Sequence, residues 1–137
     1  MTPEAKRQLI RHEGIRYLPY KDTAGHLTIG IGHNLEVPLS ETVVDMIFND
    51  DLMDVTLKLV MAEPWIFTLD DARRDVFINM AFNLGVSGLQ KFRKMLDAAR
   101  RGDWVKAAIE GMDSRWANQV GGRAIELMTQ LETGVQA

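Results

Sequence analysis

The sequence of 137 residues contains no cysteine and only three histidines, His12, His26 and His33. Without thiols the chain has no disulfide, no thiolate nucleophile and no zinc–thiolate site. With so few histidines we expect no metal ion and no cofactor. No run of 18 apolar residues occurs, and the first eleven residues are too polar for a signal peptide, so neither a membrane span nor a leader is expected.

Acidic side chains outnumber basic ones, and the net charge is −3. Residues 1–36 hold five basic and four acidic groups, residues 37–71 one and eight, and residues 72–137 ten and seven. We interpret the acidic middle of the chain as the solvated face of a long helix. No basic stripe interleaved with aromatic residues occurs, which argues against nucleic acid as a partner.

The chain is short enough for one domain and long enough to bury a core without cross-links. Thr2 and Pro3 are typical of a helix N-terminus, and Gly14 of a helix end, so a first helix is expected to run to about His12. Residues 15–35 combine turn residues with alternating apolar ones, and this pattern predicts a small antiparallel sheet.

A long helix is expected from Pro38 and Ser40 to Pro64, because apolar residues recur at helical spacing. Its stripe comprises Val44, Phe48, Leu52, Val55 and Leu59. Thr68 with Asp71 predicts a capping-box start for the next helix, whose body, residues 76–84, is almost wholly apolar and typical of a central buried helix. Further helices are expected near residues 90–100, 103–111 and 123–131.

These elements predict an α+β fold, mainly α, with a small sheet lobe and a helical lobe joined by the long helix and separated by a cleft. We expect residues 1–137 to form one domain. The sheet lobe and long helix would cover about residues 13–60, and the helical lobe residues 1–12 and 61–137.

Two carboxylates and a hydroxyl stand out in residues 12–33. Glu13 and Asp22 are nine residues apart, and Thr28 follows six residues later. Hydrolysis of a glycosidic bond needs such a carboxyl pair, one to protonate the leaving oxygen and one to serve the opposite face of the sugar. Taken singly, the three residues also fit structural roles: a surface glutamate before a glycine, an Asx-type turn and a strand threonine.

The ordered block E-G-x(5)-Y-K-D-T-x-G-x(2)-T-I-G-I-G-H, residues 13–33, resembles the phage-type lysozymes, the muramidases of glycoside hydrolase family 24. The resemblance implies that Glu13 is the general acid. It implies that Asp22 orients or activates the attacking water and stabilises positive charge at the anomeric carbon, and that Thr28 holds that water.

The resemblance extends over essentially the whole chain. Residues 77–85 are similar to the family's central helix, and S-R-W-A-N-Q at residues 114–119, followed by Arg123, is similar to a second family block. The candidate sugar-binding residues that it implies are Gly32, Asn34, Phe82, Asn83 and Arg123. Gly30 and Gly32 would give the cleft a flat floor, and Asn83 stands where the family has a longer glutamine.

Other family positions imply structural roles. Trp116 is expected in the core, and His33 is expected to form an ion pair with Asp51 rather than to act in catalysis. The family places the arginine at position 123 against the catalytic Glu13. Only residues 34–39 separate His33 from the long helix, a shorter segment than in T-even phage relatives, so the upper wall of the cleft is expected to differ.

The family's activity implies hydrolysis of the β-1,4 bond between N-acetylmuramic acid and N-acetylglucosamine in bacterial peptidoglycan. We expect a monomer that does not insert into membranes, held in the host cytoplasm until a separate pore-forming protein, a holin, releases it to the cell wall. Two alternatives remain open: a lytic transglycosylase, which needs one glutamate but not Asp22, and a non-catalytic wall-binding module.

Overall fold

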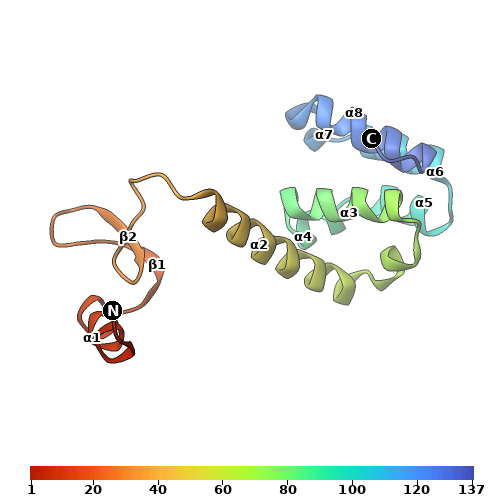
Figure 1. Ribbon diagram of the computed structural model, residues 1–137. Helices are drawn as coiled ribbons and strands as arrows, with labels where there is room; N and C mark the ends of the chain where they lie inside the picture. Colours follow the sequence, from red (N-terminus) through yellow and green to blue (C-terminus); the bar gives the residue numbers. More distant parts are fainter. The chain divides into compact units, whose positions relative to one another are not determined.

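A computed structural model describes all residues from Met1 to Ala137. It contains eight α-helices, one 3-10 helix and a three-stranded antiparallel sheet, which confirms the predicted α+β, mainly α, class (Figure 1). The elements are α1 (Pro3–Glu13), β1 (Arg16–Lys21), β2 (Leu27–Gly30), β3 (His33–Asn34), α2 (Glu41–Ala62), η1 (Pro64–Thr68), α3 (Asp71–Leu84), α4 (Val86–Gln90), α5 (Arg93–Arg100), α6 (Trp104–Met112), α7 (Arg115–Val120) and α8 (Gly122–Thr133).

Contacts divide the chain into two compact units, Met1–Ile47 and Phe48–Ala137, and the boundary falls inside α2. The first unit therefore holds α1, the sheet and the start of α2, and the second holds most of α2 and all later helices. The predicted lobe boundaries and the predicted cleft stay predictions. None of the helices combines the length and the apolar character that crossing a membrane requires.

The first helix forms as its capping residues predict. The Thr2 hydroxyl accepts a hydrogen bond from the Ala5 amide at 3.2 Å, and Pro3 occupies the first turn, where no amide is needed. Gly14 ends the helix with φ +76°, a conformation that a residue with a Cβ rarely adopts, and its amide donates to the Ile10 carbonyl. Glu13 is therefore the last residue of α1, one position beyond the predicted end.

The predicted antiparallel sheet is also confirmed. Strand β2 lies in the middle, and Thr28 faces Tyr20 of β1 on one side and Asn34 of β3 on the other. The register is irregular between Arg16 and Tyr20. The tight turn between β1 and β2 begins at Asp22, and this turn builds the first part of the candidate site.

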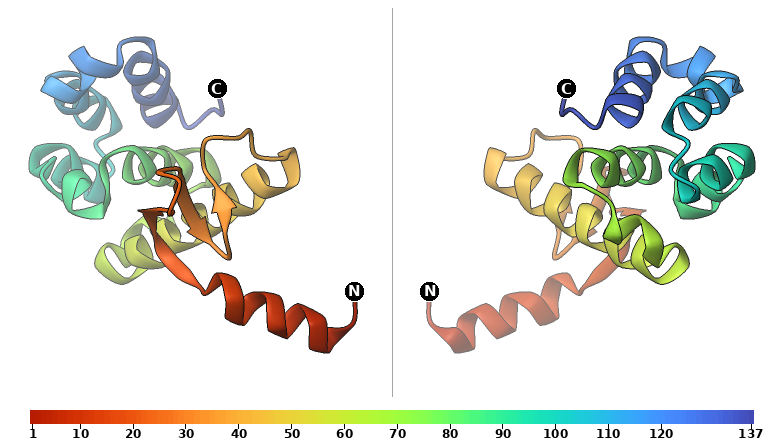
Figure 2. Two further views of the ribbon diagram at one scale, coloured as in Figure 1. Left: turned by 90° about the vertical axis from the view of Figure 1, so that its left-hand side faces the viewer. Right: turned by 90° about the vertical axis from the view of Figure 1, so that its right-hand side faces the viewer.

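The second unit has one hydrophobic core to which η1 and all helices from α2 to α8 contribute. Leu59 is fully buried at the end of the predicted α2 stripe, and α3 buries Val76, Phe77 and Met80. Helices α6 and α8 pack side by side (Figure 2). At Gly111 of α6 a Cβ would overlap the sulfur of Met128 of α8. The opposite face of α3, however, is exposed, so this helix is not buried all round.

The predicted capping box at Thr68 is wrong. Thr68 ends η1, and its hydroxyl donates to the Trp65 carbonyl at 2.7 Å instead of capping α3. Asp70 takes the capping role, because its carboxylate accepts from the Arg73 amide at 3.0 Å. A carboxylate at the N-terminus of α3 also interacts favourably with the helix dipole. Asp70, two residues after Thr68, therefore supplies the N-cap that α3 needs.

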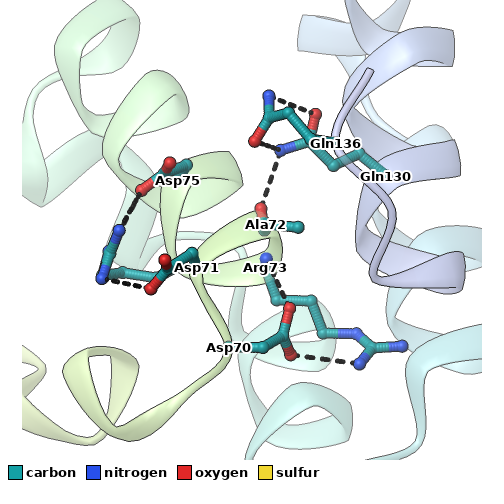
Figure 3. A network of polar contacts seen from close by, with 8 residues as sticks. Asp70, Asp71, Ala72, Arg73, Asp75, Gln130 and Gln136 are labelled. Carbon is teal, nitrogen blue, oxygen red and sulfur yellow. Dashed lines mark hydrogen bonds and ion pairs between the residues drawn. The ribbon is translucent and has the colours of Figure 1, made fainter.

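Polar contacts join the start of α3 to the end of α8 (Figure 3). The Arg73 guanidinium donates to the Leu131 carbonyl at 2.8 Å and to the Glu132 carbonyl at 2.9 Å, which satisfies carbonyls that the helix end leaves free. The Gln130 amide donates to the Ala72 carbonyl at 2.7 Å. The two helices on which several candidate site residues lie are thereby held together.

Two short helices were not predicted from the sequence. Helix α4 follows directly on Gly85, and five residues that include Ser87 and Gly88 carry too little periodicity to be recognised. Helix α7 begins where the Ser114 hydroxyl accepts from the Ala117 amide at 3.1 Å. Ser114 is a residue type that often caps a helix N-terminus, and the start of α7 could have been predicted from it.

Glu63 departs from the prediction that the acidic segment is solvated. The acidic residues of α2 are exposed, but Glu63 is only 7% exposed. Its carboxylate accepts from Trp65 Nε1 at 2.6 Å, from Arg100 at 2.7 Å and from Gln90 at 3.3 Å. Burial opposes ionisation, but the hydrogen bonds from Trp65 and Arg100 outweigh it and hold the pKa of Glu63 below its ordinary value.

We predict that Glu63→Gln lowers the free energy of unfolding by about 1–3 kcal/mol at neutral pH, because Arg100 loses a charged, buried partner. A depressed pKa in the folded state means that this stabilisation exists above the ordinary glutamate pKa and disappears as the pH falls through the folded value. Urea unfolding of both proteins across the acid range measures the difference.

The control is Asp54→Asn, which breaks the exposed ion pair of Asp54 with Lys58 on α2. This change should cost well under 1 kcal/mol. A Glu63→Gln penalty that is no larger than the control, or that persists unchanged in acid, would contradict the assignment.

Candidate active site

Glu13 ends α1 with its carboxylate over Gly32. A Cβ built at Gly32 would lie 2.6 Å from Glu13 Oε2, and Gly32 has φ +67°. Both the close approach and the positive φ require a residue without a side chain. The structure thus gives Gly32 a specific role beside the candidate acid, and its predicted contact with sugar stays a prediction.

Asp22 is held by the main chain of its own turn. Its Oδ1 atom accepts from the Ala24 amide at 2.9 Å and from the His26 amide at 2.8 Å. This is the Asx-type turn that the residues alone allowed. Both bonds end on Oδ1, so within the hairpin Oδ2 is left without a partner and is available to a water molecule or a sugar.

Thr28 lies next to this turn on β2 and is only 4% exposed. Its hydroxyl donates to the His26 carbonyl at 2.9 Å, and the Asp22 amide donates to the same carbonyl at 2.9 Å. A hydroxyl has one proton to donate, so the lone pairs of the Thr28 oxygen can accept a hydrogen from water. The structure therefore brings Asp22 and Thr28 together through the main chain of His26.

His26 and Glu36 form an ion pair that sequence reasoning missed. His26 Nδ1 lies 2.8 Å from Glu36 Oε2. The hydrogen bond with Glu36 is the main cause that raises the pKa of His26 above its ordinary value, and it lowers the pKa of Glu36. Because Thr28 pairs with Asn34 in an antiparallel sheet, positions 26 and 36 must face each other across the strands. The His26–Glu36 pair could have been predicted only from this register.

Asn34, a candidate sugar-binding residue, is half-buried on β3. Its Oδ1 atom accepts from the Glu36 amide at 2.8 Å. The acceptor atom of the side chain is thus occupied, and the two amide hydrogens remain free to donate, for example to sugar hydroxyls.

The second unit holds the other candidate residues, Phe82 and Asn83 on the exposed face of α3 and Arg123 on α8. Arg123 of α8 donates from Nε and Nη2 to Asn79 Oδ1, at 3.0 and 2.6 Å. Asn83 Oδ1 accepts from Trp116 Nε1 at 2.8 Å, which leaves the Asn83 amide hydrogens free. Trp116 is buried, as predicted, whereas Asn79 was not predicted, although it lies one helical turn before Asn83.

Phe82 lies on the same face and is 39% exposed. Its ring packs against Phe48 with the centroids 5.8 Å apart. The two rings border a cavity of about 500 Å³ that combines apolar walls with a few polar groups, a composition typical of a ligand site. The lining residues are Phe48, Leu52, Thr56, Asp75, Ile78, Asn79, Phe82 and Arg123.

Two predicted contacts join residues of different units. Arg123 with Glu13 is one, and His33 with Asp51 is the other. Both contacts therefore stay predictions.

Sequence comparison places the chain in a class and then in a family. The α+β fold together with the family match supports the class of glycoside hydrolases that degrade peptidoglycan. The sequence profile of the phage lysozyme family matches residues 10–131. The chain belongs to the phage lysozyme family.

Three relatives are similar over nearly all of this chain. The pre-baseplate central spike protein Gp5 of Enterobacteria phage T4 is 33% identical over 158 positions, which cover 92% of this chain but 27% of the spike protein. Probable T4-type lysozymes 1 and 2 of Dictyostelium discoideum are 29% and 28% identical over 165 positions, 98% of this chain and 96% of each relative. Because 165 positions exceed the 137 residues here, the lysozyme relatives carry segments that this chain lacks.

We predict that Gly32→Ala lowers the rate of peptidoglycan hydrolysis roughly 10- to 100-fold, because the new methyl group displaces the Glu13 carboxylate. Gly30→Ala is the matched control, since Gly30 has nearly the same φ, +69°, but nothing within 4 Å of its Cβ position. Both variants should lose about 1–2 kcal/mol of stability from the positive φ. Equal activities of the two variants, with equal melting temperatures, would contradict the proximity argument.

Proposed function

We propose that this protein is a muramidase that hydrolyses the β-1,4 bond between N-acetylmuramic acid and N-acetylglucosamine in bacterial peptidoglycan. The observation that carries the proposal is the hairpin arrangement in which Asp22 Oδ1 is fixed by two amides while Oδ2 is left without a partner. The Thr28 hydroxyl, bonded to the same turn, supplies a second acceptor for a water molecule. Membership of the phage lysozyme family supports the substrate class.

In the proposed reaction Glu13 donates its proton to the glycosidic oxygen, and the bond from that oxygen to the anomeric carbon breaks. A water molecule attacks the anomeric carbon from the opposite face. Asp22 Oδ2 accepts one of its protons, and Thr28 accepts a hydrogen bond from its other O–H group. The Asp22 charge also stabilises the positive charge that develops on the sugar.

Sugar binding is assigned to five residues in this proposal. In the first unit Gly32 gives the sugar a flat surface and Asn34 offers amide donors. In the second unit Asn83 also offers amide donors, Phe82 an apolar ring, and Arg123 a cation already oriented by Asn79. No metal ion or cofactor takes part.

The proposed setting is host lysis by a phage or prophage. The monomeric enzyme would stay in the host cytoplasm until a holin opens the membrane. The similarity to a pre-baseplate central spike protein favours a second candidate setting, in which the same chemistry belongs to a part of the phage particle. A lytic transglycosylase is the alternative within the enzyme class, but its mechanism gives no role to a water held by Asp22 and Thr28.

Glu13→Gln should reduce wall lysis by about 10²- to 10⁴-fold, because the amide keeps the shape of the side chain and removes the transferable proton. Turbidity of a cell-wall suspension measures the rate. Glu4→Gln, on the same helix and in an exposed pair with Arg7, should lyse walls at the parent rate. A folded Glu13→Gln protein with near-parent activity would exclude Glu13 as the acid.

We also predict inversion at the anomeric carbon. A water held between Asp22 and the sugar needs room, so the Glu13 and Asp22 carboxyl groups should be roughly 6.5–9.5 Å apart, not the ~5–5.5 Å of a retaining enzyme. NMR of the fresh product should show the α-anomer first. Initial formation of the β-anomer would instead make Asp22 a nucleophile.

A further inference from the structure

His26 connects the two residues that the proposed function assigns to the attacking water. Its amide donates to Asp22 Oδ1 at 2.8 Å, and its carbonyl accepts from the Asp22 amide and from the Thr28 hydroxyl, both at 2.9 Å. No other residue of the hairpin bonds to both side chains. A small displacement of the His26 main chain would therefore move Asp22 and Thr28 together.

The side chain of His26 is in turn fixed by Glu36. The Glu36 carboxylate lies 2.8 Å from His26 Nδ1 through Oε2 and accepts from the Leu27 amide at 3.4 Å through Oε1. The Glu36 amide donates to Asn34 at 2.8 Å. Glu36 thus ties the turn between β1 and β2 to the end of β3, although the pair itself is half exposed.

We propose that His26 is a positioning residue of this active site. Its ion pair with Glu36 holds the turn so that Asp22 and Thr28 keep their common geometry, and this hold weakens when His26 loses its proton. The inference rests on the proposed function, because it assigns His26 no contact with substrate and lets it act only through Asp22 and Thr28.

The charges around His26 define the direction of the pH effect. Glu36 and Asp22 are the two anions that face it, and Lys21, which pairs with Leu27 through the main chain, forms no ion pair with either. Glu36, first by its hydrogen bond and then by its charge, and Asp22 by its charge, raise the pKa of His26. The His26–Glu36 ion pair therefore holds the turn fully at acid pH, and this effect is lost as the pH rises through the raised pKa of His26.

Deprotonation weakens the contact without abolishing it. A neutral imidazole can still donate from Nδ1, but the bond loses the charge assistance that roughly doubles its strength. The weakened contact should consequently lower turnover only about two- to fivefold on the alkaline side, in addition to the fall that follows when Glu13 has no proton to donate. KM should change little, because neither His26 nor Glu36 is assigned to sugar binding.

The test compares kcat and KM on purified, soluble glycan strands from pH 5 to 9 for the parent, His26→Ala, His26→Asn and Glu36→Gln. His26→Ala should lose about five- to tenfold in kcat. The amide of His26→Asn can replace the Nδ1 donor and does not titrate. Most of the neutral-pH kcat should therefore return, and the alkaline fall should be smaller than in the parent, because only the proton that Glu13 must donate is then lost. Glu36→Gln should move the alkaline fall to lower pH, because it removes the charge that raises the pKa of His26.

Arg7→Ala is the matched control, because it breaks an exposed ion pair of the same unit that is remote in sequence from the hairpin. It should leave the pH profile unchanged. Thermal melts show that each variant is folded, and if His26→Ala does not fold, His26→Asn and Glu36→Gln carry the test.

The inference is overturned if His26→Ala keeps the parent kcat and pH profile, or if the alkaline fall is as large in His26→Asn as in the parent. Asp22→Asn, measured in parallel, distinguishes failure of the positioning role from failure of the proposed function. If Asp22→Asn is inactive while His26→Ala matches the parent, the positioning role alone fails. If Asp22→Asn itself keeps the parent rate, the proposed function fails.

Discussion

Two backbone amides on one oxygen of Asp22 are the constraint on which the catalytic account depends. The Ala24 and His26 amides fix Oδ1, so the direction of Oδ2 is set by the turn and not by a flexible side chain. A preorganised carboxylate of this kind needs no rearrangement when charge develops on the sugar. The turn is therefore both the structural start of the hairpin and the proposed water site.

The candidate acid depends on backbone geometry of a different kind. Glu13 is the last residue of α1, so the end of this helix determines where the carboxylate lies. Gly14 ends the helix at a positive φ, and Gly32 provides the surface against which the carboxylate lies. The identity of these glycines thus follows from the place that Glu13 must occupy.

Much of this arrangement could be predicted from local signals, because caps, turns and strand alternation act over a few residues. The helix Pro3–Glu13, predicted to end at about His12, and the sheet around Thr28 followed from such signals. The errors concern choices between neighbours: Asp70 and not Thr68 caps α3, since Thr68 bonds to Trp65 within η1. Local patterns cannot distinguish two capping residues that are two positions apart.

The unpredicted features are long-range side-chain pairs. Glu63 belongs to an acidic segment but is buried because Arg100, 37 positions away in the sequence, reaches it. His26 and Glu36 are also paired only once the register of β2 and β3 is known. The roles of Glu13, Asp22 and Thr28 came from the family pattern and not from spacing, because each residue alone also fits a structural role.

The central claim is that Asp22 and Thr28 deliver a water molecule to the sugar, and the chemical nature of the product tests it most directly. Mass spectrometry of soluble fragments released from purified peptidoglycan distinguishes a reducing N-acetylmuramic acid end from a 1,6-anhydro end, which is lighter by one water molecule. The account predicts reducing ends throughout. Fragments with 1,6-anhydro ends would contradict it, because no water would then have entered the product.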